Sequence, residues 1–574
     1  MTDTIRPPFS RPPWYRLGRQ SARPVLSRPA QSLGWGALLI AMLFALPIFS
    51  VVSSIFLTGK GTWAHLADTV LPGYIGNTLF LVLAVGLCVP IIGTGTAWLV
   101  TLCRFPGRRI FEWALILPLA VPAYVMAYAY TDFLQVSGPL QSALRDLTGW
   151  RYGDYWFPEV RSLGGAAAML ALVLYPYVYM LARAAFLEQS VCALEVSRTL
   201  GRGPWGSFLV VAVPLARPAI AAGTALALME TLADYGVVSF FGVPTFATGI
   251  VRAWISLGDR VAAAQLASTL LGFVFIVLLL ERWSRCRARY HHTSSRYQRL
   301  PGYRLTGAKS ALAFLACAVP LTIGFLLPAA ILLKMAIEAG DSQFGSRFLH
   351  LAVNSFTLAA VTASLAVLLA TVMAYGHRLN PGRWSALANR VASMGYAVPG
   401  SVIAVGVLIP FARLDNALDA WLRANFDVSS GLLLTGSIAA LVFAYLVRFL
   451  AVSLNTIEAS LGKVRLSMDD AARSLGRGPG STLFHVHAPL MLRGLLTAAL
   501  LVFVDVMKEL PATLVMRPFN FDTLAVQAYN LAADERLTEA STASLAIVAV
   551  GVLPLILLSR AIAEGRPGGG DATP

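Results

Sequence analysis

Residues 200–204 read Leu-Gly-Arg-Gly-Pro, and the same five residues return at 475–479, an offset of 275 positions. The match continues outward in the same register, since Pro214-Leu215 returns as Pro489-Leu490. An internal repeat of this length indicates two copies of one folding unit in tandem. The fold of one unit therefore predicts the fold of the other.

The composition around these segments is that of a membrane protein. Of the 574 residues, 57% are hydrophobic and 13% are charged, and the mean hydropathy is +0.67. About 20 apolar residues cross a bilayer as a helix, which satisfies its own backbone hydrogen bonds. We predict an all-α polytopic protein of two six-helix halves, with spans near 34–57, 77–101, 110–133, 163–186, 214–238, 262–281, 310–337, 353–376, 387–412, 431–455, 489–513 and 541–561.

The basic residues predict the topology and the domains. The segment 282–309 contains eight basic residues and no acidic one, so the positive-inside rule places it in the cytoplasm together with both termini. Because each half has an even number of spans, both halves share one orientation and the pathway should lie between them. The predicted parts are a tail at 1–33, a first half at 34–281, a linker at 282–309, a second half at 310–563 and a tail at 564–574.

Each half carries one polar segment between its fourth and fifth spans. The segments read Glu-Val-Ser-Arg-Thr-Leu-Gly at 195–201 and Asp-Ala-Ala-Arg-Ser-Leu-Gly at 470–476. This pattern predicts a short helix whose small residues permit close contact with a partner, and which ends at a glycine with positive φ. The residues predicted to make that contact are Glu195, Gly201, Arg202, Pro204, Asp470, Ala471, Ala472, Gly476 and Arg477.

These two segments resemble the cytoplasmic EAA loops of permeases of binding-protein-dependent ABC importers. The first copy departs from the pattern at Val196 and Ser197. The resemblance implies that two copies of a cytoplasmic ABC ATPase bind the loops, and that a periplasmic binding protein delivers the cargo to a bacterial inner membrane. The chain has no G-x-x-x-x-G-K-[ST] phosphate loop, so we expect ATP to be used by partner subunits, with no cofactor and no catalytic residue here.

Charged residues inside apolar spans predict a cargo pathway, because such residues are costly in lipid. Glu230 and Asp234 align with Asp505 and Glu509 at the offset of 275, and each pair has the i, i+4 spacing of one helix face. Four carboxylates around the axis would attract a cation, although no stable metal site is expected. The alternative is that Lys508 pairs with some of these acids, or that they meet water at the outer interface. The predicted pathway or gate residues are Glu230, Asp234, Tyr235, Asp505 and Glu509.

Two further predictions concern three tyrosines and two prolines within the spans. Tyr124 and Tyr128, together with Tyr235, either line the route or serve in packing. Val121-Pro122 recurs as Val398-Pro399, and these prolines are predicted to kink the third and ninth spans.

Two stretches are similar to permeases of iron(III) importers. One runs from Glu230-Thr-Leu-Ala-Asp-Tyr-Gly to Trp254, and the other begins Asp505-Val-Met-Lys-Glu-Leu-Pro-Ala-Thr. The resemblance implies uptake of ferric ion. Thiamine, polyamines and oxyanions stay open as cargoes of the same importer class, and a secondary transporter driven by an ion gradient is the alternative from another class. The basic residues are not interleaved with aromatics in a soluble domain, so no nucleic-acid partner is expected.

Overall fold

The computed structural model describes residues 28–57, 62–188, 197, 199–201, 203–286, 303–339 and 345–564. Two of the predicted contact residues, Glu195 and Arg202, lie outside the described residues. The same holds for most of the predicted tails and for the central part of the predicted linker.

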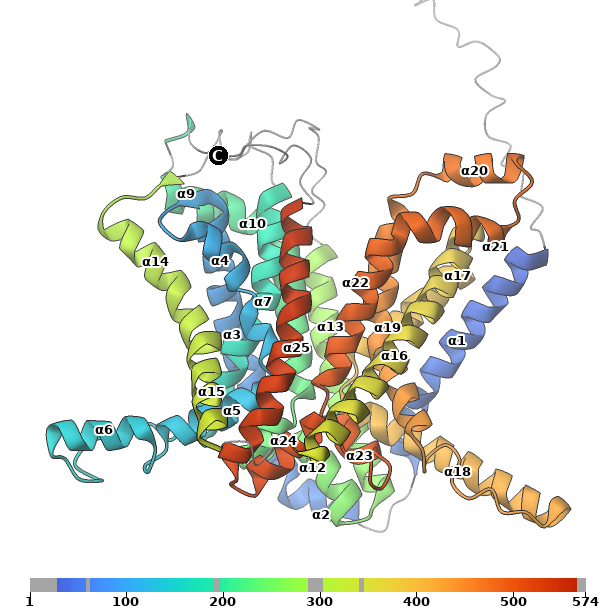
Figure 1. The fold of residues 1–574 in the computed structure, drawn as a ribbon, viewed down its shortest axis with the longest axis horizontal. Coiled ribbons are helices and arrows are strands. Elements are labelled where there is room, and N and C mark those ends of the chain that lie inside the picture. Colours follow the sequence, from blue (N-terminus) through green and yellow to red (C-terminus); the bar gives the residue numbers. More distant parts are fainter. Residues whose placement is uncertain are drawn as a thin grey trace, which may run out of the picture.

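Almost all of the described chain is helical (Figure 1). The first half contains α1 (Arg28–Ser53), α2 (Thr62–Thr69), α3 (Leu71–Leu102), α4 (Arg108–Ala114), α5 (Ala123–Leu134), α6 (Pro139–Thr148), α7 (Leu163–Glu188), α9 (Pro204–Ser207), α10 (Val213–Ala233), α11 (Gly236–Phe240), α12 (Phe246–Val251) and α13 (Arg260–Cys286). The second contains α14 (Ala308–Leu321), α15 (Leu327–Ala339), α16 (Ser346–Leu379), α17 (Arg383–Met394), α18 (Gly400–Phe426), α19 (Ile438–Gly462), α20 (Leu466–Ser474), α21 (Pro479–Thr482), α22 (Ala488–Met507), α23 (Pro511–Met516), α24 (Leu524–Ala533) and α25 (Leu537–Glu564).

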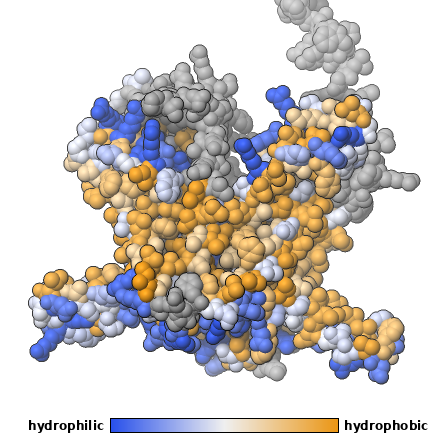
Figure 2. Space-filling model, viewed as in Figure 1, coloured by the Kyte–Doolittle hydropathy of each residue, from blue (hydrophilic) through white to orange (hydrophobic). Residues whose placement is uncertain are grey.

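The number of spans agrees with the hydropathy of the sequence. Within the described ranges, 11 helices are long and apolar enough to cross a membrane, and a bent pair at 108–120 and 123–148 makes up to 12. Figure 2 shows a hydrophobic band around the middle of the molecule with hydrophilic residues at both ends. The predicted class, an all-α polytopic membrane protein, is confirmed.

The third and ninth predicted spans are broken, and the predicted simple kinks are wrong. Val121 and Val398 are extended, with ψ of 115° and 126°, and a new helix starts directly after each following proline. A proline ring disfavours the helical conformation of the residue before it, so each helix ends at its Val-Pro pair. In the first half, the segments on either side of Pro122 meet at 91°.

The two halves exchange their first helices. α1 packs against α16, α17 and α18 of the second half, whereas α14 and α15 pack against α3, α4 and α5 of the first. Figure 1 shows α1 at the right beside the second half and α14 with α15 at the left beside the first. A short parallel strand pair, β1 (Cys103–Arg104) with β2 (Tyr303–Arg304), joins the first half to the last part of the linker. The two sequence repeats are thus intertwined rather than side by side.

Candidate functional site

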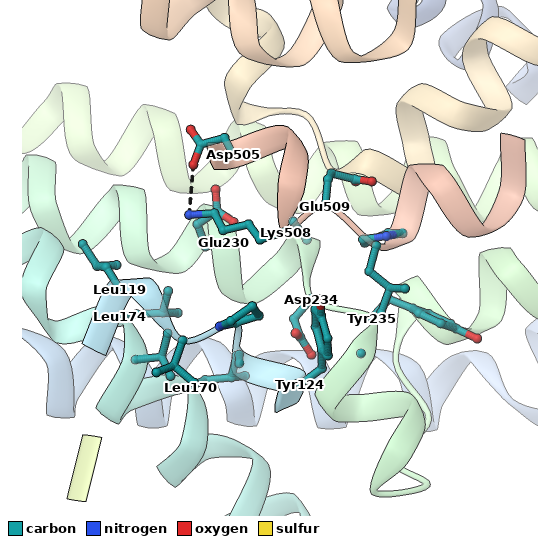
Figure 3. Close-up of a pocket in the computed structure, with 18 of the residues that line it drawn as sticks. Leu119, Tyr124, Leu170, Leu174, Glu230, Asp234, Tyr235, Asp505, Lys508 and Glu509 are labelled. Carbon is teal, nitrogen blue, oxygen red and sulfur yellow. Dashed lines mark ion pairs between the residues drawn. The ribbon is translucent and has the colours of Figure 1, made fainter. Parts of the chain in front are cut away.

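A cavity between the halves contains all five predicted pathway residues. Glu230, Asp234 and Tyr235 line it from the first half, and Asp505 and Glu509 line it from the second (Figure 3). The prediction that these residues lie together between the halves is therefore confirmed in its geometry. Their part in transport stays a prediction.

The acidic pairs do not lie on continuous helices, so the predicted i, i+4 helix faces are wrong. α10 ends at Ala233 and α22 ends at Met507, which leaves Asp234 and Glu509 just beyond them. Asp234 Oδ2 accepts hydrogen bonds at 3.2 Å from the amides of Val237 and Val238. A carboxylate that binds nearby amides offers the backbone an alternative to continued helix.

Glu509 has the same role in the second half. Its carboxylate accepts hydrogen bonds from the amides of Ala512 at 3.1 Å and Thr513 at 3.2 Å. The Thr513 hydroxyl also donates to Glu509 Oε2 at 3.0 Å. Asp234 and Glu509, which correspond at the offset of 275, therefore cap the first turns of α11 and α23 from the position just before each N-cap residue.

A capping role makes a specific prediction for Asp234. Asp234→Ala should lower the stability of the purified protein by about 0.5–2 kcal/mol, the usual cost of losing a polar cap, whereas Asp234→Asn should be nearly neutral because asparagine also caps. Thermal unfolding in detergent would measure the difference. Equal destabilisation by both variants would instead indicate that the charge matters and the cap does not.

Arg448 also lines the cavity, and the predictions from the sequence did not include it. It belongs to α19 and is only 7% exposed. Its Nη1 lies 3.2 Å from Glu509 Oε1, and its Nη2 lies 3.4 Å from Glu230 Oε2. The Arg448–Glu230 pair therefore crosses the interface between the halves. The signal was available, since Arg448 is a charged residue inside a predicted apolar span.

The start of α18 packs directly onto this ion pair. A Cβ atom at Gly400 would lie 2.5 Å from Glu509 Oε1 and 2.8 Å from Arg448 Nη1. Only glycine allows the backbone to approach the two charged groups so closely.

A second ion pair joins Lys508 and Asp505, whose Nζ and Oδ1 atoms are 2.9 Å apart (Figure 3). The alternative that Lys508 pairs locally with one of the acids is confirmed. The described lining thus combines four carboxylates with two basic side chains. Among the described residues, no group of three or more His, Cys, Asp or Glu side chains is arranged to hold a metal ion.

Two pairs of tyrosines, each with one residue from each half, also contact each other across the interface between the halves. The hydroxyls of Tyr235 and Tyr529 are 3.2 Å apart, and those of Tyr177 and Tyr396 are 3.4 Å apart. Tyr124 lines the cavity, whereas Tyr128 is buried against Phe240 at a ring distance of 4.6 Å. The packing alternative therefore fits Tyr128, and the lining alternative fits Tyr124.

At the other end of the molecule, the two EAA-like segments have the predicted backbone turn. Gly201 and Gly476 have φ of 76° and 74°, which confirms the expected positive φ. The leucines just before them, Leu200 and Leu475, are 72% and 80% exposed. Exposed apolar side chains at a rigid turn suit contact with another protein.

The acid that connects the second segment to the rest of the protein is Asp469, whereas the contact of Asp470 with an ATPase stays a prediction. Asp470 is exposed and pairs only with Arg473 of the same helix among the described ion pairs. Asp469 Oδ2 lies 2.7 Å from Arg378 Nη2 of α16, and its Oδ1 lies 2.8 Å from Nε2 of the buried His487. Asp469 therefore ties α20 to two membrane helices, which the EAA pattern alone does not reveal. Of the other predicted contact residues, Ala471 and Arg477 are exposed, Ala472 is buried and Pro204 begins α9.

The family model for binding-protein-dependent transport system inner membrane components matches residues 91–285 and, a second time, residues 366–565. The chain is 25% identical to the Fe(3+)-transport system permease protein FbpB 2 of Haemophilus influenzae, over 85% of this chain and 89% of that protein.

Two further relatives are also transport system permeases. The ferric transport system permease protein FbpB of Actinobacillus pleuropneumoniae is 23% identical over 86% of this chain and 72% of its own length. The molybdenum transport system permease protein ModB of Escherichia coli is 30% identical over 35% of this chain and 87% of its own length. With the family model matched once in each half, the chain belongs to the binding-protein-dependent transport system inner membrane components, as a multi-pass transport subunit rather than an enzyme.

Proposed function

We propose that this chain carries both permease halves of an ATP-driven importer that moves ferric iron into a bacterial cell. The observation that carries the proposal is the carboxylate-rich cavity between the halves, in a chain that matches ferric transport permeases over most of its length. Carboxylate oxygens are the ligands that hard, highly charged cations prefer.

In this proposal, two copies of a separate ABC ATPase bind the EAA-like segments, and both termini lie on that cytoplasmic side. A loaded binding protein docks at the opposite end, where α12 and α24 lie (Figure 1). Closure of the ATPases moves the two segments together and opens the interface between the halves outward. The halves then rock back and release the cargo inward.

An oxyanion is the second candidate cargo. The molybdenum permease relative and the presence of Arg448 and Lys508 in the cavity favour it. Proteoliposomes containing the chain with its ATPase and binding protein should accumulate radioactive ferric iron when ATP is supplied. Uptake of molybdate or sulfate with no uptake of iron would replace the ferric proposal with the oxyanion one.

The coupling role of the segments is tested at their glycines. Gly201→Val and Gly476→Val place a β-branched residue in the left-handed region, which costs about 1–2 kcal/mol per residue and should distort the turn. We expect ATP-dependent uptake to fall strongly while the protein stays in the membrane. Gly478→Val is the matched control, because Gly478 has φ of −74° and open space around its Cβ position. Normal uptake in the Gly201→Val/Gly476→Val double variant would overturn the coupling role.

A further inference from the structure

We propose that the molecule has two lateral arms that bind lipid. They lie in the membrane–water interface on the periplasmic side of the inner membrane. The first arm is residues 136–161, which include α6, and the second is residues 411–433, which include the end of α18. Figure 1 shows both projecting sideways from the bundle, on opposite sides and at the end far from α20. The assignment of the arms to the periplasmic side rests on the proposed function, which puts α20 in the cytoplasm.

The arms are a repeat of each other. At an offset of 274, the pattern Leu-Gln-x-Ala-Leu at 140–144 returns as Leu-Asp-x-Ala-Leu at 414–418. This offset is close to the 275 of the Leu-Gly-Arg-Gly-Pro repeat and to the 277 that separates Val121 from Val398, so the arms occupy equivalent places in the two halves. Neither arm contributes to the cavity between the halves.

Each arm is a folded piece, fixed by a buried polar residue at the second position of that pattern. Gln141 donates to the Leu134 carbonyl at 2.8 Å and accepts from the Tyr155 hydroxyl at 2.7 Å. Asp415 accepts from the amides of Leu434 at 3.0 Å and Thr435 at 2.8 Å. These bonds hold α6 against the end of α5 and against the segment that follows it, and hold the end of α18 against the segment that follows it. The exposed faces of the arms are therefore held in place.

Apolar side chains cover one face of each arm. Leu140 and Leu147 are seven residues apart on α6, as are Leu414 and Trp421 on α18, so each pair shares a helix face. Leu147 is 86% exposed and Trp421 is 55% exposed. The other large exposed apolar residues of the arms are Val136, Trp150, Tyr152, Trp156, Leu418, Phe426, Val428, Leu432 and Leu433.

The place and chemistry of these faces fit a lipid surface. α18 is a single helix from Gly400, buried at the cavity, to the exposed Phe426, so its apolar face continues the lipid-facing surface outward. Tryptophan and tyrosine favour the membrane interface, and an amphipathic helix there buries its apolar face at the headgroup boundary. A binding protein that docks over the central axis would lie between the arms. Lipid, by contrast, surrounds both.

Environment-sensitive labels test this placement. Leu147→Cys and Trp421→Cys, in a variant with the five native cysteines replaced by alanine, would carry an NBD fluorophore in phosphatidylglycerol–phosphatidylethanolamine nanodiscs. We expect blue-shifted emission, weak quenching by aqueous iodide and strong quenching by lipid with a headgroup nitroxide. Asp146→Cys and Asn416→Cys, exposed polar positions on the same two helices, are the controls and should show water-like emission with strong iodide quenching.

Because the cysteine-free variant could fail to fold, the unmodified protein supplies a second measurement. Nitroxide lipid should quench its tryptophan fluorescence more than that of a Trp156→Phe/Trp421→Phe variant. Labels at Leu147 and Trp421 that match their controls would overturn the proposal. Protection that arises only when a binding protein or a second copy of the chain is added would also overturn it. Neither assay uses ATP or iron, so failure of the lipid proposal can be distinguished from failure of the ferric iron proposal.

Discussion

Arg448→Met should destabilise the protein by about 3–5 kcal/mol and abolish ATP-dependent uptake. The cost is that of removing one partner from a buried ion pair, which leaves the remaining charges uncompensated. Here the uncompensated groups are Glu509, whose side chain is 2% exposed, and the less buried Glu230. Because the Glu230 contact crosses between the halves, its loss should also loosen their interface. Thermal unfolding and proteoliposome uptake would measure the two effects.

Two companion variants separate charge from shape at this site. Arg448→Lys retains the charge, but a lysine ammonium lacks the two terminal nitrogens by which the guanidinium contacts both carboxylates. The stability of this variant should therefore be intermediate. The triple variant Arg448→Met/Glu230→Gln/Glu509→Gln removes the buried charges together and should recover most of the stability but not the uptake. A single Arg448→Met variant with normal stability and uptake would show that this ion pair does not hold the halves.

Much of the architecture could be predicted because a lipid environment leaves few alternatives. Apolar runs of about 20 residues must form helices there, and a repeat at a nearly constant offset must form two equivalent halves. Hydropathy cannot detect a break within an apolar run, and for that reason the turns at Asp234 and Glu509 were predicted as helix. At Pro122 and Pro399 the Val-Pro pairs did carry a usable signal, since the residue before proline favours an extended backbone.

The contents of the site were only partly predictable for a different reason. Alignment of the two halves at the offset of 275 pairs residues at equivalent places. It therefore paired Asp234 with Glu509 and Glu230 with Asp505. It cannot find contacts between residues that are not equivalent. Arg448 and Glu230 are 218 positions apart and meet only when the halves assemble. The exchange of α1 and α14 between the halves is invisible to the repeat for the same reason.

Asp469→Asn should uncouple ATP hydrolysis from transport, whereas the neighbouring Asp470→Asn, at a position predicted to contact the ATPase, should leave the ratio of cargo transported to ATP hydrolysed unchanged. Asp469 is the residue through which α20 contacts Arg378 and His487, all three largely buried. Asparagine removes the negative charge beside Arg378, whose other partners among the described residues are the uncharged carbonyls of Leu461 at 2.7 Å and Val464 at 2.9 Å. A buried arginine left in this way is strongly destabilising locally, so α20 should move without carrying α16 and α22 along.

The sequence of the first half does not repeat these three side chains. At the offset of 277 that relates Val121 to Val398, Arg378 corresponds to Thr101. At the offset of 275, Asp469 and His487 correspond to Leu194 and Ala212, with Leu194 outside the described residues. The ratio of cargo taken up to ATP hydrolysed in proteoliposomes would therefore fall in Asp469→Asn, and hydrogen exchange in α20 would rise. Asp470→Asn removes only an exposed pair with Arg473, worth about 0–1 kcal/mol, and controls for the loss of one negative charge on the same helix. If the two variants gave the same ratio, force would reach the membrane helices by contacts other than Asp469, and the exposed surface of α20 would be the place to seek them.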